Sequence, residues 1–342
     1  MIPELTTLCY IEKDDCYLML HRIKKEHDIN KDKWIGIGGH FEGTESPDEC
    51  LKREVLEETG LTLTSYRFRG LVTFVAGDQC LEYMALYTAD GFTGEIKECD
   101  EGALEWVPKK DVYDLELWAG DKLFFRLLEE ERPFFSLKLV YDEKGVLRQA
   151  ALDGKEMELL DILGEDGTPS GVVQERDTAH MLGLLHATVH MWVVRKTASG
   201  KWEVLLQRRS RNKDSNPGCW DISSAGHIAA GDEKLPAAVR ELKEELGITA
   251  DASELLPVGF TRRKTDKPFY GKMWPDHQIS HIYIYRGNVD ETKLSLQASE
   301  VETVKWYDLE DVIRMTEGDA AFPNCLNPEE LRMIEKYLQQ GE

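Results

Sequence analysis

Basic residues are scarce relative to acidic ones in this chain of 342 residues. Its 42 Lys and Arg stand against 64 Asp and Glu, which gives a formal net charge of −22. Affinity for a nucleic-acid polymer comes chiefly from neutralising backbone phosphates with Lys and Arg. The charge balance therefore argues against a polynucleotide as the main partner. A small phosphorylated ligand stays compatible with it, because a few local cations and carboxylate-held metal ions suffice to bind one.

Long hydrophobic runs and paired cysteines are also absent. The longest apolar stretch, 181–194, is interrupted by His186 and His190 and is too short to cross a membrane. The seven cysteines include no Cys-x-x-Cys pair, so neither a zinc site nor a disulfide framework is indicated. The first residues lack the basic and then apolar pattern of a secretory signal. These observations predict a protein of the reducing cytoplasm.

One spaced pattern of glycine, acidic and basic residues is present twice. The first copy reads Gly39-x5-Glu45-x7-Arg53-Glu54-Val55-Leu56-Glu57-Glu58-Thr59-Gly60-Leu61, and the second reads Gly226-x5-Asp232-x7-Arg240-Glu241-Leu242-Lys243-Glu244-Glu245-Leu246-Gly247-Ile248. Each follows an apolar segment with a Trp and precedes two strand-like runs, a further Trp and a helical stretch. The repeat is therefore a whole domain. A polar turn at 152–155 predicts domains 1–152 and 153–342.

Local composition predicts the same kind of elements in both halves. Enrichment in β-branched and aromatic residues predicts strands at 6–12, 16–22, 66–76, 81–89, 134–141, 187–195, 202–209, 255–263 and 278–286. Helices are expected at 46–59, where Pro47 suits the first turn and Gly60 the end, and at 235–246, which Gly247 ends. The expected fold class is α/β, with two α/β/α sandwich domains that each place a mixed β-sheet between helices.

The repeated pattern gathers like charges on one helix face. Positions three and four apart share a face, so the clusters are Glu54, Glu57, Glu58 and Glu241, Glu244, Glu245. Such repulsion calls for a compensating partner, and carboxylates suit Mg²⁺ or Mn²⁺ better than zinc. Arg53 and Arg240 can orient these carboxylates. Gly39 and Gly226 are expected to permit a tight turn. The alternative is that the acidic faces are ordinary solvated surface.

The spacing of both copies resembles the Nudix box. That resemblance implies metal-dependent hydrolysis of a nucleoside diphosphate linked to a further group, with a metal that bridges phosphates and activates water. It also makes the first acidic position, Glu45 or Asp232, a structural partner of the box arginine. The shorter Asp232 thus weakens the second box only slightly.

The first half resembles MutT-like Nudix hydrolases from about residue 6 to 151. The likeness is carried by Leu20-His21-Arg22, Trp34-Ile35-Gly36-Ile37-Gly38-Gly39, the box, Glu101 ahead of Trp106, and Leu117-Trp118-Ala119-Gly120-Asp121. It implies catalytic roles for Arg53 and the box glutamates. It also makes Glu101 a further metal ligand or base, although Glu101 could equally be an exposed loop acid. The substrate contacts it implies are Arg22, Gly38, Gly39, Trp118 and Asp121.

The same resemblance suggests a substrate for the first half. It favours 8-oxo-dGTP or a similar purine triphosphate, cleaved to the monophosphate and pyrophosphate. Family members that recognise 8-oxoguanine specifically tend to carry an Asn after the Trp that precedes the box and two Asp after the later Trp. Here those positions hold Ile35 and Gly120-Asp121. The resemblance therefore implies the type of reaction more firmly than the identity of the substrate's nucleobase.

The second half resembles the Nudix group related to isopentenyl-diphosphate isomerase. The likeness runs from 158–161 to about Trp306, and includes Gly167-Thr168-Pro169-Ser170-Gly171, Gln207-Arg208-Arg209-Ser210, Lys213, Pro217-Gly218 and Ala225-Gly226-His227. Isomerases carry a catalytic Cys where this chain has Ala225. Three hypotheses stay open for this half: a hydrolase of unknown substrate, an isomerase, and a non-catalytic ligand-binding module. Arg208 and Lys213 are candidate phosphate contacts.

Histidines form a further candidate site in the second half. The isomerase-like metal site uses several, which His180, His186 and His227 match loosely. A histidine in an apolar run is more often a packed core residue, so both interpretations stand. Glu300 and Glu302, shortly before Trp306, are the candidates for the role of Glu101.

Overall fold

The computed structural model describes residues 2–24, 28–78, 80–213, 215–269, 272–316, 318 and 322–340. The chain forms two compact units, each with its own core. The first unit comprises Met1–Leu159 and Val172–Thr178, and the second comprises Leu160–Gly171 and Ala179–Glu342. Within the described residues, every helix falls short of the length and apolarity that crossing a bilayer requires.

The first unit is built on one mixed sheet. Its strands are β1 (Glu4–Lys13), β2 (Cys16–His21), β3 (Trp34–Ile35), β4 (Thr62–Ala76), β5 (Cys80–Thr93), β6 (Ala103–Pro108), β7 (Phe135–Tyr141), β8 (Leu147–Leu152) and β9 (Lys155–Glu156). They lie in the order β3-β2-β1-β5-β4-β7-β8-β9, with β6 beside β2. The pairs β1–β5 and β4–β7 are parallel and the other pairs are antiparallel.

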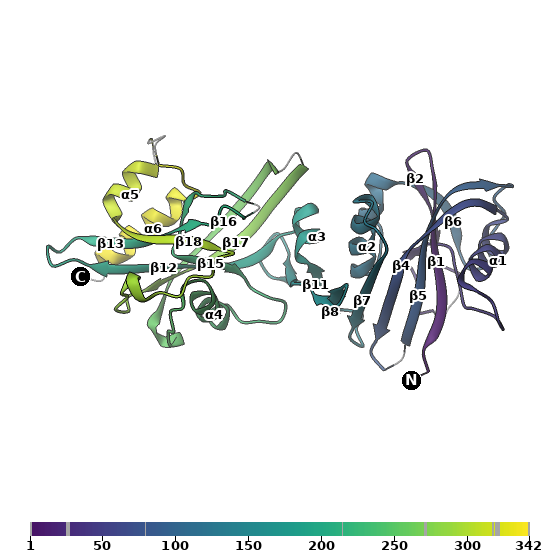
Figure 1. Ribbon diagram of the computed structural model, residues 1–342, viewed down its shortest axis with the longest axis horizontal. Coiled ribbons are helices and arrows are strands. Elements are labelled where there is room, and N and C mark those ends of the chain that lie inside the picture. Colours follow the sequence, from purple (N-terminus) through teal and green to yellow (C-terminus); the bar gives the residue numbers. More distant parts are fainter. Residues whose placement is uncertain are drawn as a thin grey trace. The chain divides into compact units, whose positions relative to one another are not determined.

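Helices α1 (Pro47–Thr59) and α2 (Ala119–Glu129) cover opposite faces of this sheet (Figure 1). Strand β1 shows why, because its side chains alternate between the faces. Cys9 and Ile11 join the core under α1. The ring of Tyr10 points the other way and lies 4.6 Å from the ring of Phe125 on α2. This is the predicted α/β/α sandwich.

The second unit repeats the layered arrangement. Its strands are β10 (Leu159–Leu163), β11 (Pro169–Glu175), β12 (His186–Lys196), β13 (Trp202–Arg209), β14 (Trp220–Asp221), β15 (Ser224–His227), β16 (Leu255–Phe269), β17 (Lys272–Tyr285) and β18 (Val301–Asp308). The part of β11 from Val172 onward belongs to the first unit. Strand β12 is central and pairs with β10, β13, β15 and, in parallel, β17.

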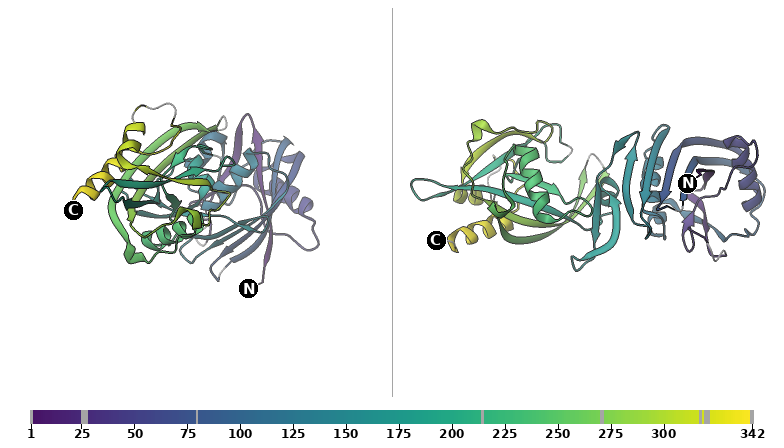
Figure 2. Two further views of the ribbon diagram at one scale, coloured as in Figure 1. Left: turned by 60° about the vertical axis from the view of Figure 1, so that its left-hand side comes forward. Right: turned by 90° about the horizontal axis from the view of Figure 1, so that it is seen from below.

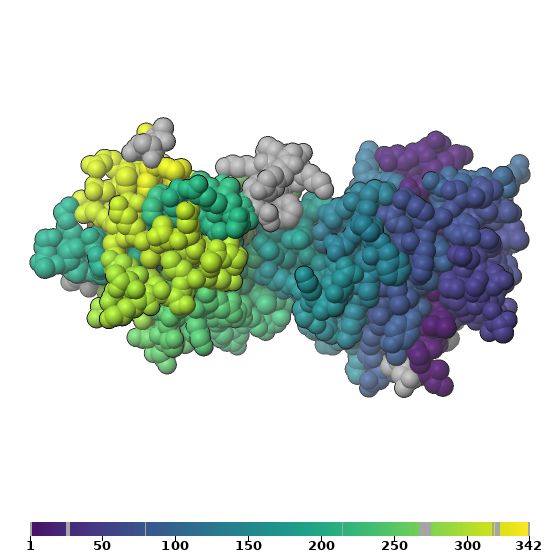
Figure 3. Space-filling view, viewed as in Figure 1, coloured from purple at the N-terminus to yellow at the C-terminus, as the bar shows by residue number. Residues whose placement is uncertain are grey.

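The helices of the second unit again lie on both faces of the sheet. Val189, Met191 and Val193 of β12 join the core under α4 (Lys234–Leu246). Trp192 and Val194 face the core under α5 (Leu309–Thr316) and α6 (Pro328–Gln340). Figure 2 shows these helices and strands from two further sides, and in Figure 3 α5 lies in the yellow-green part of the surface of this unit. Short α3 (Arg176–Met181) precedes β12.

The predicted elements agree closely with the structure. Both helices that carry the repeated pattern end where glycine was expected, since Gly60 and Gly247 adopt left-handed conformations with φ of 79° and 72°. The predicted strands were too short at β4, β5, β16 and β17. Polar residues near the ends of these long antiparallel pairs look like loop sequence in isolation, whereas the pairing with a neighbouring strand extends them.

Candidate catalytic sites

Helix α1 is held firmly at the end nearest the loop that precedes it. Ser46 accepts a hydrogen bond from the Glu49 amide, and the Glu49 carboxylate accepts one from the Ser46 amide, which forms a complete capping box. Pro47 lies in the first turn. The cap fixes where the helix starts, and with it the direction of the three glutamates about two to three turns later.

Two of these glutamates contact the glycine-rich loop before the helix. The Gly38 amide donates a hydrogen bond of 3.1 Å to Glu58 Oε2, and Glu58 is only 7% exposed. A Cβ atom on Gly39 would lie 2.5 Å from the Glu54 carboxyl carbon. Glu57 is largely exposed, with a side chain that is 61% accessible. The three carboxylates therefore line one edge of the loop, from its buried base to solvent.

Gly39 is required for a different reason from the one that its sequence position suggested. The sequence led us to expect glycine there for a tight turn, and neither Gly39 nor Gly226 has a positive φ. Both are instead needed for close approach, because a side chain there would collide with Glu54 or Glu241. The glycines thus leave room for a carboxylate.

Arg53 ties the acidic face to the loop. Its guanidinium donates to both carboxylate oxygens of Glu45 at 2.7 and 2.9 Å, and to Glu54 at 2.7 Å. It also donates to the His40 carbonyl at 2.9 Å. This network is the structural role expected for Glu45 and the box arginine.

The second unit reproduces this arrangement. The Ala225 amide donates to Glu245 Oε2 at 3.1 Å, and a Cβ on Gly226 would lie 2.1 Å from the Glu241 carboxyl carbon. Arg240 pairs with Asp232 and lies 3.8 Å from Glu241. Burial raises the pKa of Glu245 to about 7, although hydrogen bonds from Ser224 and Ala225 oppose the shift.

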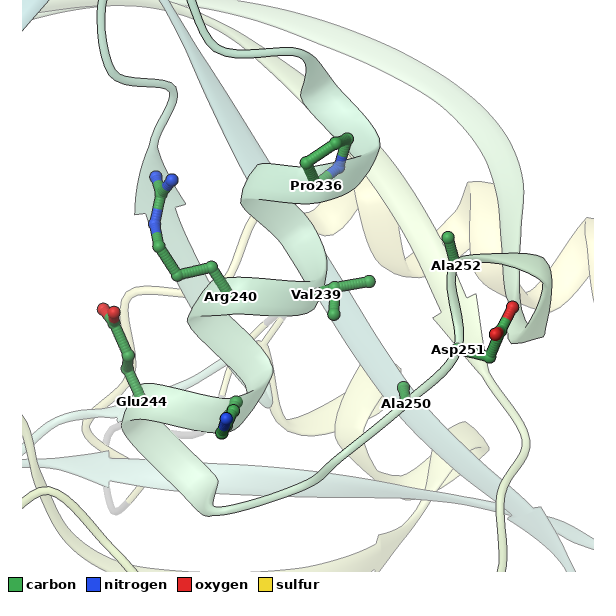
Figure 4. Close-up of a pocket in the computed structure, with 8 residues that line it drawn as sticks. Pro236, Val239, Arg240, Glu244, Ala250, Asp251 and Ala252 are labelled. Atoms are coloured by element: carbon green, nitrogen blue, oxygen red, sulfur yellow. The ribbon is translucent and has the colours of Figure 1, made fainter.

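The outer face of α4 carries the exposed part of this second site. A shallow depression runs beside the helix and is lined by Pro236, Val239, Arg240, Lys243, Glu244, Ala250, Asp251 and Ala252. In Figure 4 the side chains of Arg240 and Glu244 extend to one side of the helix, away from Ala250 and Asp251. Their common direction follows from the four-residue spacing.

The candidate general bases lie in ion pairs with the candidate phosphate contacts. In the first unit Glu101 pairs with Arg22, which also bonds Asp28 at 2.7 Å. In the second unit Glu300 pairs with Lys213. The alternative candidate, Glu302, lies 3.8 Å from Arg208.

A cluster of side chains in the first unit surrounds Trp118, which directly precedes α2 and is 8% exposed. The Trp118 indole donates to Asn30 Oδ1 at 2.8 Å, and the Lys33 ammonium lies 4.7 Å from its ring centre. Phe74 packs edge-on against it at 5.3 Å. The Asp121 carboxylate accepts a hydrogen bond from the Trp118 amide. Asp121 is 7% exposed, and this burial raises its pKa to about 7. An aromatic ring and a carboxyl group, both largely buried, thus lie together at the start of α2.

Three histidines of the second unit converge. The nitrogen atoms of His180, His186 and His227 lie within 4.8 Å of one another. His186 donates through Nδ1 to the Leu184 carbonyl at 2.9 Å, which leaves the lone pair on its Nε2 atom. His180 Nδ1 lies 3.9 Å from Asp276. The donor set fits a divalent metal ion, and this convergence favours the ligand interpretation over that of three separate core histidines.

Both halves match one family model. The model described as "NUDIX domain" matches residues 3–128 and 184–324. The chain belongs to the Nudix family. Its relatives include an oxidized purine nucleoside triphosphate hydrolase of Danio rerio, 31% identical over 32% of this chain and 71% of that protein. Another is an isopentenyl-diphosphate Delta-isomerase of Cereibacter sphaeroides, 31% identical over 41% of this chain and 73% of that protein. Among solved structures, a MutT protein of Bacillus halodurans is 28% identical, with a TM-score of 0.40 over 44% of this chain and 99% of its own.

The two Nudix boxes therefore form two sites of the same design. In each, the donors are hard carboxylate oxygens on a helix face and an arginine that offsets their repulsion, a set that fits Mg²⁺ or Mn²⁺. Sequence reasoning missed the residues that surround Trp118, namely Asn30, Lys33, Phe74 and Tyr141. They come from separate loops and strands, and no spacing in the chain links them to Trp118.

Proposed function

We propose that this Nudix enzyme hydrolyses two kinds of diphosphate-containing small molecule, one in each half. The first half cleaves 8-oxo-dGTP or a related purine nucleoside triphosphate to the monophosphate and pyrophosphate. The second half is a hydrolase for another diphosphate. The supporting observation is the duplicated carboxylate geometry, in which the loop amide before the box glycine donates to the last box glutamate in both units.

The Trp118 site supports a purine substrate in the first half. An indole offers a flat apolar surface on which a base stacks. Asp121 can accept a hydrogen bond from a base edge when ionised and donate one when protonated, and its pKa of about 7 makes both states accessible. The similarity to the Danio rerio hydrolase points to the same class of substrate. Ile35 and Gly120 occupy positions where enzymes specific for 8-oxoguanine carry polar side chains. Base selectivity is therefore expected to depend on Asp121.

Mg²⁺ is the proposed cofactor. Glu54, Glu57 and Glu58 would hold it in the first half, and Glu241, Glu244 and Glu245 in the second. When bound, such an ion neutralises charge on phosphate oxygens and lowers the pKa of the attacking water. Arg53 holds Glu54 in place for this role. Arg22 is placed to receive a phosphate, and Glu101, now paired with Arg22, to take up a proton from water.

Hydrolysis is favoured over isomerisation in the second half. Residue 225 is the alanine of β15, whose methyl group cannot exchange protons as the isomerase thiol does. A purely ligand-binding module is disfavoured too, because the acidic helix face and its arginine are kept in the same arrangement as in the first half. The three histidines would hold a second metal ion, and Arg208 and Lys213 would contact the diphosphate. The proposed setting is the reducing cytoplasm, with neither a membrane nor a polynucleotide as partner.

Single charge-neutral variants of the full chain test both sites. Glu57→Gln removes an exposed metal ligand with little effect on folding, and should lower 8-oxo-dGTP hydrolysis with Mg²⁺ at least about 100-fold. Glu244→Gln should spare that activity and abolish hydrolysis of a different diphosphate. Phosphate and pyrophosphate release is measured on a panel of nucleotides, sugar nucleotides and prenyl diphosphates.

Glu143→Gln provides the control, because it removes one exposed acid of the first unit outside either site. It should leave every activity unchanged. Full 8-oxo-dGTP hydrolysis by Glu57→Gln would rule out the metal role proposed for the first box. If Glu244→Gln retains all diphosphate activities, the second half is not a working hydrolase for these compounds.

A further inference from the structure

A short segment from beyond the predicted domain boundary belongs to the first unit. Residues Val172–Thr178 follow Leu160–Gly171 of the second unit and precede Ala179, where the second unit resumes. The segment contains the end of β11 and the start of α3. Gln174, Glu175 and Thr178 are 1%, 3% and 0% exposed, whereas Val172 at the start of the segment is 50% exposed.

A buried ion pair joins this segment to α2. Glu175 accepts a hydrogen bond of 3.1 Å from Arg126, which is 9% exposed. The same carboxylate accepts from the Thr178 amide at 2.9 Å and the Thr178 hydroxyl at 2.7 Å, and the Asp177 amide donates at 3.0 Å to its other oxygen. A charge removed from water in this way is tolerated only with such complete partners, and it holds the segment in one position along the helix.

A second bond reaches the start of α2, next to Trp118. The Gln174 side-chain amide donates to the Ala119 carbonyl at 3.1 Å. Ala119 is the first residue of α2 and directly follows Trp118. In the same turn, the Gly120 amide donates to the Tyr141 hydroxyl at 2.8 Å. Two hydrogen bonds from outside α2 therefore hold the turn 118–121, and Gln174 makes one of them.

We propose that Val172–Thr178 is a brace that positions the nucleotide-binding turn 118–121, with Gln174 and Glu175 as positioning residues. The inference rests on the proposed function of the first half. Trp118 and Asp121 recognise the base only if α2 keeps its place, since small displacements of binding groups weaken recognition strongly. The brace acts on substrate affinity and leaves the carboxylates on α1 untouched.

Gln174→Met in the full chain tests the brace. It keeps the length of the side chain and removes the donor to Ala119. We expect KM for 8-oxo-dGTP to rise about fivefold to tenfold while kcat stays within about twofold. Hydrogen exchange of the amides at 119–122 should quicken by a similar factor. Gln149→Met is the matched control, because the Gln149 side chain donates to the exposed Glu156 at 2.7 Å, away from the turn 118–121. It should change neither KM nor the exchange at 119–122.

The outcomes separate the brace from the proposed function. A wild-type chain that hydrolyses no nucleoside triphosphate would overturn the proposed substrate, and the exchange measurement would then decide the brace alone. Unchanged hydrogen exchange at 119–122 in Gln174→Met would overturn the brace. A fall in kcat as large as the rise in KM would overturn it too. Should Gln174→Met fail to fold, Glu175→Gln weakens the pair with Arg126, and the same two readings apply to it.

Discussion

At the scale of single residues, small or absent side chains shape the two sites as much as the charged side chains do. Gly39 and Gly226 supply no side chain, which is what lets Glu54 and Glu241 approach the loop. Ala225 supplies no thiol, and the hydrolase role proposed for the second half rests on that difference. Asp121 is the opposite case, since a carboxyl group is retained where burial disfavours its charge.

The burial of Asp121 predicts a pH dependence of stability. Its pKa rises from an ordinary value of 3.8 to about 7 in the folded protein. The folded state therefore binds the proton more tightly, so stability from this group is greatest below pH 4 and is lost as pH rises towards 7. Asp121→Asn should remove up to about 1.4 kcal/mol of pH dependence per pH unit between pH 4.5 and 6.5. This pH dependence of the free energy of unfolding is measured by urea unfolding in the presence of EDTA. Hydrogen exchange of peptides from α2 reports on the unit that contains Asp121.

Asp142→Asn is the control for this experiment. Hydrogen bonds from the Val146 amide and the Arg148 side chain lower the pKa of Asp142, so its contribution is lost only as pH falls below about 4. Its replacement should leave the slope between pH 4.5 and 6.5 unchanged. An Asp121→Asn protein with the wild-type slope would mean that Asp121 is already ionised throughout this range.

At the scale of elements, the two Nudix helices have matching ends but different starts. Both end at a left-handed glycine, whereas α1 has a full capping box and the residue before α4, Glu233, makes no side-chain cap bond. The extra hydrogen bonds at Ser46 and Glu49 satisfy amides that would otherwise lack a partner in the first turn.

The cap of α1 predicts a local stability effect. Ser46→Ala removes the acceptor for the Glu49 amide and should destabilise the first unit by about 1 kcal/mol. Glu233→Ala, at the corresponding position before α4, should be nearly neutral. Urea unfolding followed by hydrogen exchange in α1 and α4 compares the two. Equal effects at both positions would contradict the assigned role of the cap.

The elements also show what sequence reasoning can reach in this chain. Both Nudix helices, and the acidic face on each, follow from spacing within 23 residues of chain, because helix periodicity fixes which side chains share a face. The surroundings of Trp118 do not follow from spacing. Asn30 and Phe74 meet it only after the sheet has formed, and Gln174 reaches Ala119 from across the predicted boundary at 152. Such contacts depend on strand order, which local patterns leave open.

At the scale of the whole molecule, duplication places two acidic sites in a chain whose formal net charge is already −22. Self-repulsion of this size weakens the compact state, and any salt relieves part of it by screening. Divalent ions held at the proposed sites would act in addition, because they would bind the assembled carboxylates and not the unfolded chain. The two effects can be separated, since screening depends on ionic strength while binding depends on particular residues.

Magnesium should therefore stabilise the protein beyond the effect of salt. At matched ionic strength, MgCl₂ at about 100 times its dissociation constant should add about 2.7 kcal/mol to each unit relative to NaCl. Glu57→Gln should remove most of this gain from the first unit only, and Glu244→Gln from the second only, because each cluster lies within one unit. Glu143→Gln changes the net charge equally and should keep the full gain in both. Hydrogen exchange in urea reports the stability of α1 and of α4 separately. If all three variants keep the full gain in unfolding free energy, Mg²⁺ acts here by screening alone.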